Sequence, residues 1–125
     1  IPLRLVGSEM CIRDSNICEP LDYTINQPGK NIRKHLILYI QYLLGNKNPY
    51  ISQIINDINV THNATLIIDD IHDQSFKRRG KTCAYLLFGK PLTLNAGYLK
   101  TLQILDNLDT HYPKTALDEI RKLYK

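Results

Sequence analysis

Three aspartates near the middle of the chain have the spacing of a metal site. Asp69, Asp70 and Asp73 stand in the run Asp-Asp-Ile-His-Asp, at the end of a segment with helical periodicity. In a helix, Asp69 and Asp73 lie one turn apart on one face, with His62 further along the same face. Two carboxylates on an inward face repel each other unless a cation neutralises them. Mg²⁺ takes carboxylate oxygens and completes its shell with water and substrate phosphates, so the pattern predicts a metal-bound diphosphate.

The position of the acids along the helix leaves a second interpretation open. The face that carries Asp69 and Asp73 begins with the apolar residues Ile51, Ile55 and Ile58, which we expect to point into the protein. If the helix instead ends before Asp69, the acids form a solvated cluster at its C-terminus. The helix macrodipole makes carboxylates unfavourable there, which speaks against this alternative.

Two pairs of cationic residues could hold the anionic part of such a ligand. Arg78 and Arg79 follow the acidic run in a predicted loop, and Lys30 and Arg33 lie one turn apart after a Pro-Gly turn. Guanidinium groups fork two hydrogen bonds onto phosphate oxygens, and free amides at a helix start also favour anions. Each pair alone is more typical of a solvated surface. The order of the two pairs around the acidic run favours a diphosphate site.

Helical periodicity accounts for most of the chain after residue 28. Apolar spacing together with Gly and Pro breaks predicts helices over residues 30–44, 49–73, 82–88, 92–108 and from 113 onward. Asn48 is expected to cap the second of them, with Pro49 at its first position. Residues 75–80 are predicted to form a loop. No period-two pattern persists anywhere, so the predicted fold class is all-α.

Composition limits the function classes. The 125 residues are 43% apolar, and no apolar stretch is long enough to cross a bilayer, so no transmembrane segment is expected. The formal charge of +4 is spread over several segments, which disfavours nucleic-acid binding. Cys11, Cys18 and Cys83 form no CxxC motif, which is typical of reduced thiols and predicts a cytoplasmic protein.

Residues 1–18 differ in character from the rest. They show no clean period, and residues 6–15 look like translated adapter sequence or a disordered extension. The first residue is Ile rather than Met, so we expect the chain to begin inside a longer reading frame. The expected organisation is an unrelated leader over 1–18 and one helical unit over 19–125.

Three segments in the same order resemble the trans-prenyltransferase, or polyprenyl synthetase, family. Residues 28–33 look like its PGKxxR motif, residues 62–73 look like HNASLLIDDIED, and Arg78-Arg79-Gly80 follows at the family's distance. The likeness is greatest to eukaryotic geranylgeranyl diphosphate synthases. It implies that residues 19–125 are the N-terminal part of an isoprenoid-synthase helical bundle, truncated after the first aspartate-rich helix region.

The resemblance also implies roles for individual residues. The acidic run and one arginine would hold the metal and the allylic diphosphate: Asp69 and Asp73 as Mg²⁺ ligands, Asp70 in support, and Arg78 on the diphosphate. Four basic residues would grip isopentenyl diphosphate: Lys30, Arg33, His62 and Arg79. The allylic partner would be dimethylallyl, geranyl or farnesyl diphosphate. The reaction would be head-to-tail condensation after ionisation of the allylic C–O bond, catalysed by a homo-oligomer.

The length of the product is expected to depend on the residues just before the acidic run. In the family, a bulky aromatic residue four or five positions before the first aspartate stops chain growth early. Ala64 and Thr65 occupy those positions here, which favours a C20 product over a C15 product. Small residues at these positions could equally serve close packing between helices.

Three departures from the family pattern leave alternatives open. His72 replaces the usual acid inside the aspartate-rich run, and Lys100 stands where the family has further aromatic residues. The family's second aspartate-rich motif is missing after Leu108, so a non-catalytic partner subunit of a complete synthase is the main alternative. A helical phosphohydrolase that uses His62, His72 and Asp73 as metal ligands is a weaker one, because it leaves Lys30 and Arg33 without a role.

Overall fold

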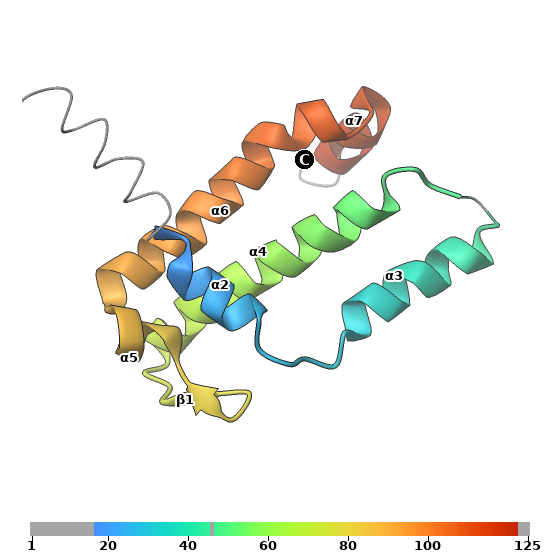
Figure 1. The fold of residues 1–125 in the computed structure, drawn as a ribbon. Coiled ribbons are helices and arrows are strands. Elements are labelled where there is room, and N and C mark those ends of the chain that lie inside the picture. Colours follow the sequence, from blue (N-terminus) through green and yellow to red (C-terminus); the bar gives the residue numbers. More distant parts are fainter. Residues whose placement is uncertain (1–16, 46, 123–125) are drawn as a thin grey trace, which may run out of the picture.

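Two long helices dominate the protein. The computed structural model describes residues 17–45 and 47–122, so almost all of the predicted leader over residues 1–18 lies outside the described residues. Helix α4 (Ile51–His72) and helix α6 (Lys90–His111) run antiparallel along each other for most of their length (Figure 1). The segment that joins them carries a short hairpin and the small helix α5 (Ala84–Phe88).

Small residues bring α4 and α6 together. Ala64 on α4 and Ala96 on α6 are completely buried. At Gly97, an added Cβ would lie 3.0 Å from Cδ1 of Ile68 and 3.3 Å from the carbonyl oxygen of Ala64. A side chain at this point would require Ile68 or the adjoining backbone to shift by a few tenths of an ångström, because protein interiors leave few voids.

The core lies at one end of this helix pair. Helix α2 (Glu19–Ile25) and α5 pack there against both long helices (Figure 1). The buried apolar side chains of this core are Leu21, Ala64, Ile67, Ala84 and Ala96. The rings of Tyr23 and Phe88 meet edge to face at its rim, with centroids 5.8 Å apart. This end of α4 is the end that carries the acidic run, so the core fixes the direction in which each carboxylate points.

Two further helices lie on the outside of the core. Helix α3 (Ile32–Leu43) contacts α4 without burying any of its own residues, and α7 (Lys114–Lys122) follows α6. The helix predicted over residues 30–44 begins two residues later, at Ile32, because Asn31 has a left-handed conformation with φ of 51°. Helix α3 presents an exposed apolar face made of Ile32, Leu36, Tyr39, Ile40 and Leu43.

Several predicted boundaries shift because caps differ from the pattern. Helix α4 begins at Ile51, since Asn48 caps the preceding turn instead, accepting a hydrogen bond from the Tyr50 amide at 2.8 Å. Helix α6 begins two residues before the predicted 92, with Pro91 in its first turn, and extends to His111. Residues 89–91 were predicted to separate two helices, but only Gly89 does so. Its φ of 86° ends α5.

The loop predicted for residues 75–80 contains a hairpin. Strands β1 (Lys77–Arg78) and β2 (Lys81–Thr82) pair antiparallel, and Arg79 and Gly80 form the turn with φ of 53° and 79°. Two positive φ values in succession are the mark of a tight hairpin turn that matches the twist of its strands. The turn directs Arg78 and Arg79 toward different parts of the structure.

The fold class is all-α, as predicted. Apart from the two-residue strands, every element that the structure describes is a helix. Among the described helices, none combines the length and the apolar character that crossing a membrane requires.

Candidate functional site

The end of α4 places the three aspartates of the acidic run. Asp69 and Asp70 lie in the last turn of the helix, and Asp73 is its C-cap residue. Gln74 follows with φ of 53°, its amide donates to the Ile71 carbonyl, and the Ser75 amide donates to the Asp70 carbonyl at 3.0 Å. This pair of hydrogen bonds is a Schellman motif, which ends helices after a left-handed residue. The alternative in which the helix stops before Asp69 is therefore wrong.

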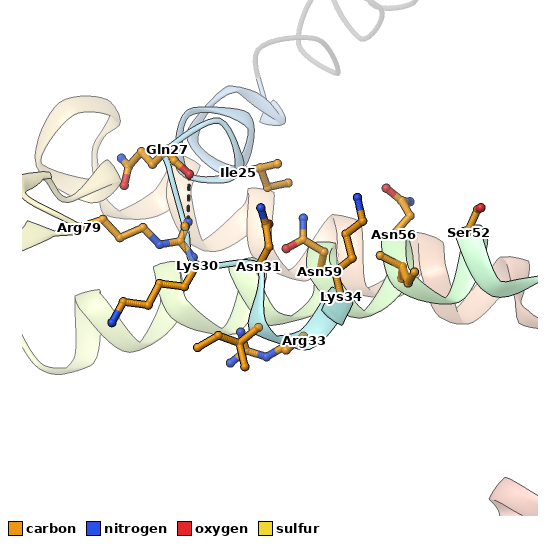
Figure 2. Close-up of a pocket in the computed structure, with 13 residues that line it drawn as sticks. Ile25, Gln27, Lys30, Asn31, Arg33, Lys34, Ser52, Asn56, Asn59 and Arg79 are labelled. Atoms are coloured by element: carbon orange, nitrogen blue, oxygen red, sulfur yellow. Dashed lines mark hydrogen bonds between the residues drawn. The ribbon is translucent and has the colours of Figure 1, made fainter. Parts of the chain in front are cut away.

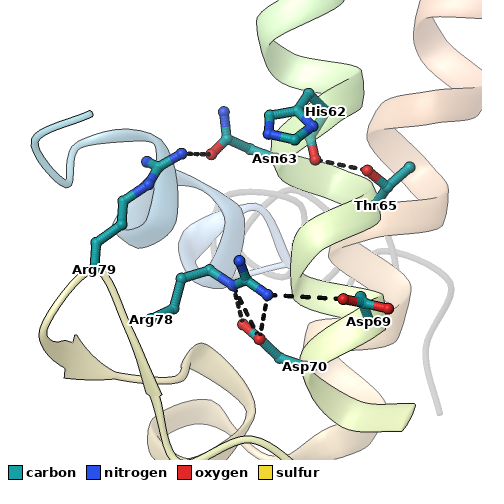
Figure 3. Close-up of polar contacts among 7 residues, drawn as sticks. All are labelled: His62, Asn63, Thr65, Asp69, Asp70, Arg78 and Arg79. Carbon is teal, nitrogen blue, oxygen red and sulfur yellow. Dashed lines mark hydrogen bonds and ion pairs between the residues drawn. The ribbon is translucent and has the colours of Figure 1, made fainter. Parts of the chain in front are cut away.

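Asp70 and Arg78 form the tightest polar contact at the site. Arg78 donates through Nε at 2.8 and 2.9 Å and through Nη2 at 2.7 Å to the Asp70 carboxylate (Figure 3). Asp70 is almost completely buried, whereas its partner is about one quarter exposed. The hydrogen bond and the charge of Asp70 raise the pKa of Arg78, against the effect of burial. This arrangement also leaves Nη2 of Arg78 turned toward Asp69.

Asp69 and Asp73 remain open to solvent beside this pair. The side chain of Asp69 is 59% exposed and lies 3.8 Å from Nη2 of Arg78, too far for a hydrogen bond (Figure 3). Asp73 is exposed, and its carboxylate has no ion pair with any other described residue. Two solvent-exposed carboxylates one turn apart are an oxygen donor set that suits a hard divalent cation.

The fit to Mg²⁺ can be judged from the number of donors. Within residues 17–45 and 47–122, no three His, Cys, Asp or Glu side chains converge on one point. Mg²⁺ does not need such a cage, because it keeps several waters and binds through one or two carboxylates together with substrate phosphates. Asp69 and Asp73 therefore fit a metal that a diphosphate helps to hold, and they do not fit a closed structural metal site.

The apolar stripe expected to point inward does so only in part. Ile58 is 40% exposed, and Ile51 and Ile55 are only half-buried. The face of α4 that is buried carries Asp57, Asn63, Ala64, Ile67 and Asp70. Helix α4 is apolar on several sides, so periodicity alone placed the inward face wrongly. Packing against α2, α5 and α6 turned Asp70 inward and left Asp69 on the open side.

Arg79 ties three segments together on the other side of the hairpin. Its Nη2 donates to Oδ1 of Asn63 at 3.3 Å (Figure 3). Its Nη1 lies 3.5 Å from the carbonyl oxygen of Gln27 (Figure 2) and 3.4 Å from that of Thr24. The guanidinium also lies against Gly29. Arg79 thereby holds the loop before α3 next to α4.

A cationic hollow of about 320 Å³ opens at this loop (Figure 2). Three of the four basic residues predicted to bind isopentenyl diphosphate line it: Lys30, Arg33 and Arg79. Lys34 adds a fourth positive charge, and Ser52, Asn56 and Asn59 of α4 supply polar groups on the opposite wall. A concave site with several cations and neutral polar groups suits a phosphate-bearing ligand.

His62 lies close enough to the cationic hollow for the arginines there to lower its pKa. Burial, and then the positive charges of Arg33, Arg79 and Arg78 in that order, lower the pKa of His62. Its side chain does not line the cationic hollow but borders a neighbouring apolar groove. His62 thus marks the boundary between the charged and the apolar parts of the site.

The apolar groove has a volume of about 620 Å³ and runs between α4, α6 and α7. Its walls include Ile54, Ile58, Thr61 and Thr65 from α4, and Ile104, Leu108, Tyr112 and Ala116 from the facing segments. Thr65 lies one turn before Asp69, so the groove begins beside the acidic run. Its hydroxyl is satisfied by the His62 carbonyl at 2.7 Å, which leaves its methyl group available to the groove.

The two residues predicted to control chain length have different positions. Thr65 lines the groove, whereas Ala64 is completely buried against α6. Ala64 therefore acts in this structure as the small residue that lets α4 approach Gly97.

Three polar residues of the site region were not predicted from the sequence. Asn63 is buried and links Arg79 to Asn59, and Asp57 and Tyr112 form a hydrogen bond at 2.6 Å. Asp57 could have been singled out only because it is the one acidic residue in the first half of α4. No sequence pattern connects it to Tyr112, which lies 55 residues away.

Comparison with known proteins identifies the class to which this fold and site belong. The chain matches the sequence profile of the polyprenyl synthetase family over residues 14–124. This protein belongs to the polyprenyl synthetase family.

Individual relatives agree with this assignment. The chain is 30% identical to a geranylgeranyl pyrophosphate synthase of Eremothecium gossypii over 85% of its own length and 34% of the relative. It is 38% identical to a geranylgeranyl pyrophosphate synthase of Mucor circinelloides f. lusitanicus, over 78% of this chain and 32% of the relative. A terpene synthase of Matsumurasca onukii is 31% identical over 90% of the chain and 38% of the relative. The chain spans about a third of the length of these relatives.

Proposed function

We propose that the domain to which this chain contributes is a Mg²⁺-dependent prenyltransferase that makes geranylgeranyl diphosphate. It would condense isopentenyl diphosphate with dimethylallyl, geranyl or farnesyl diphosphate. The observation that supports this most is the adjacency of three features: the Asp69–Asp73 pair, the cationic hollow and the apolar groove that begins at Thr65. One ligand with a diphosphate head and a hydrocarbon tail accounts for the acidic pair and the groove, and a second anionic ligand accounts for the hollow.

The allylic substrate is proposed to lie with its diphosphate at the acidic run and its tail in the groove. A bound Mg²⁺ would supply positive charge for the leaving diphosphate, with Asp69 and Asp73 as its ligands. Arg78, already fixed by Asp70, would direct its free edge to the same diphosphate. Because Asp70 holds Arg78 before the substrate arrives, little reorganisation is needed when the allylic C–O bond breaks.

Isopentenyl diphosphate is proposed to bind in the cationic hollow through Lys30, Arg33 and Arg79, with His62 at the inner rim. After diphosphate departs, its double bond would attack the allylic cation and form the new carbon–carbon bond. Loss of one proton from the resulting cation would then form the new double bond. The hollow and the groove hold the two reactants next to each other, which removes much of the entropic cost of their encounter. Apolar walls around the tail also keep water from the allylic cation.

Assay of the complete domain with labelled isopentenyl diphosphate and each allylic primer tests the proposal. We expect a C20 diphosphate as the main product, dependence on Mg²⁺, and loss of turnover in Asp69→Ala. Asp106→Ala, which removes an exposed acid of α6 remote from the acidic run, is the matched control and should retain activity.

Other results would point to other functions. Cyclic hydrocarbons without a diphosphate would favour a terpene synthase, the activity named for one relative. Binding of labelled diphosphates without any condensation would favour the non-catalytic partner subunit. Normal turnover in Asp69→Ala would contradict the site itself.

We further propose that the complete protein is a cytoplasmic homo-oligomer. The support is the exposed apolar surface on α6, formed by Tyr98, Leu102 and Leu105, together with the reduced-thiol pattern of the cysteines. Light scattering of the purified protein measures its mass directly, and fractionation of cells measures its location.

A further inference from the structure

A buried carboxylate and a tyrosine meet near the far end of the apolar groove, about one turn of α4 from Ile54. Asp57 is only 9% exposed, and each of its oxygens accepts one hydrogen bond. The Tyr112 hydroxyl donates to Oδ2 at 2.6 Å, and the Gln53 amide donates to Oδ1 at 2.8 Å. In the described part of the chain, the carboxylate has no cationic partner. Its burial is therefore supported by these two neutral donors.

The position of this pair follows from the antiparallel course of α4 and α6. Asp57 precedes Asp69 by roughly 18 Å along the helix axis. The C-terminal end of α6 lies alongside the first half of α4 (Figure 1). Tyr112, the C-cap residue of α6, contacts Asp57 there. The groove walls on α4 therefore lead from Thr65 near the acidic run, past Thr61 and Ile58, toward Tyr112.

Backbone and side chain both hold the Tyr112 ring in place. Its amide donates to the Leu108 carbonyl at 3.0 Å, and the chain then leaves the helix in an extended conformation. Burial raises the pKa of Tyr112, and the hydrogen bond and charge of Asp57 raise it further. The phenol consequently stays protonated and remains a donor at neutral pH.

We propose that Tyr112, locked by its hydrogen bond to Asp57, closes the far end of the groove and limits the length of the prenyl chain. The inference rests on the proposed function, because it takes the groove to hold the growing tail. A hydrocarbon that displaced the ring would break the hydrogen bond and leave a buried carboxylate short of a donor. Growth therefore stops when the tail meets the ring.

Product analysis of the complete domain tests this role. Tyr112→Leu shortens the side chain while keeping the site apolar, and we expect the ratio of products longer than C20 to C20 itself to rise about tenfold, the scale on which apolar pockets discriminate hydrocarbons. Tyr112→Phe keeps the ring but removes its anchor, so a smaller shift in the same direction is expected. Tyr42→Leu changes an exposed tyrosine of α3 outside the groove and should leave the products unchanged.

A double variant that also blocks the near end of the groove tests whether the tail passes Thr65 before it reaches Tyr112. Thr65→Phe should shorten the product, and the double variant Thr65→Phe/Tyr112→Leu should shorten it equally, because the tail no longer reaches Tyr112. Unchanged products in Tyr112→Leu, alongside shortened products in Thr65→Phe, would overturn the role of Tyr112 while the groove assignment stands. A wild-type domain that makes no prenyl product would instead mean that the proposed function has failed.

A second variant covers the case in which Tyr112→Leu does not fold, as judged by circular dichroism. Ala116→Phe fills the same end of the groove from α7 and does not alter the Asp57 pair. It should shorten the product. Products of normal length from both Ala116→Phe and Tyr112→Phe would overturn the proposal.

Discussion

The carboxylate of Asp70 holds the guanidinium of Arg78 by three donor–acceptor contacts of 2.7 to 2.9 Å. Asp70 lies in the last turn of α4, and Arg78 lies in the hairpin that follows it. The pair thus fixes the hairpin to the helix and orients one edge of Arg78 toward Asp69. Asp70 therefore has a structural role, whereas Asp69 and Asp73 are exposed to solvent.

Loss of this ion pair should be strongly destabilising. Arg78→Ala leaves the Asp70 carboxylate buried without its partner, and we expect a loss of about 3 kcal/mol in the free energy of unfolding. Asp70→Asn added to Arg78→Ala should recover part of the loss, because a buried amide costs less than a buried charge. Chemical denaturation of the complete protein measures both. Lys122→Ala, which breaks an exposed pair with Glu119, is the control and should have little effect.

Protonation of His62 should lower the stability of the protein. Burial and three nearby arginines lower its pKa in the folded state below the ordinary value of 6.5, so the unfolded chain takes up the proton first. Stability is therefore unaffected by this residue above pH 6.5 and falls as the pH drops below that value. His62→Gln should flatten the dependence of unfolding free energy on pH in this window.

The same environment can be tested by direct titration of His62. Among the three neighbouring arginines, Arg33 lowers the pKa of His62 most, so Arg33→Ala should raise this pKa toward its ordinary value. NMR titration of the imidazole in wild type and Arg33→Ala measures the change. An unchanged titration would contradict the placement of Arg33 near His62.

A larger residue at Gly97 should destabilise the protein while Ile68 stays in place. Gly97→Ala places a methyl group 3.0 Å from Cδ1 of Ile68, and overpacking of this kind costs about 1–3 kcal/mol. The higher helix propensity of alanine offsets about 1 kcal/mol of it, so a net loss of roughly 1 kcal/mol is expected. Ile68→Val removes the closest atom, and the double variant should be less destabilised than the sum of the single changes. Thermal and chemical unfolding provide the measurement.

Cys83 should be an unreactive thiol in the folded protein. Burial, followed by the nearby Asp70 carboxylate, raises its pKa to about 11, so little thiolate forms at neutral pH. Alkylation at pH 8, followed by peptide mapping, should modify Cys83 slowly in the native protein and rapidly in denaturant. Rapid native labelling of Cys83 would show that this part of the core opens readily.

The sequence could not predict the hairpin or the rotation of α4 about its own axis. Strands of two residues are too short for any period to appear, so residues 75–80 read as a loop. The turn at Arg79 and Gly80 nevertheless decides that Arg78 faces Asp70 and Arg79 faces Asn63. In α4, isoleucines occur on more than one face, and their spacing could not indicate which face the rest of the protein would cover.

The sequence by itself determined the helical elements, the acidic run and the order of the basic residues around it. These depend on local spacing and on motifs that are contiguous in the chain. Only the tertiary structure decided that Asp70 is buried while Asp69 and Asp73 are open, because the packing of Ala64 and Ile67 sets the rotation of α4. Tertiary packing likewise brought Tyr112 to Asp57, since a contact across 55 residues depends on how α6 returns along α4.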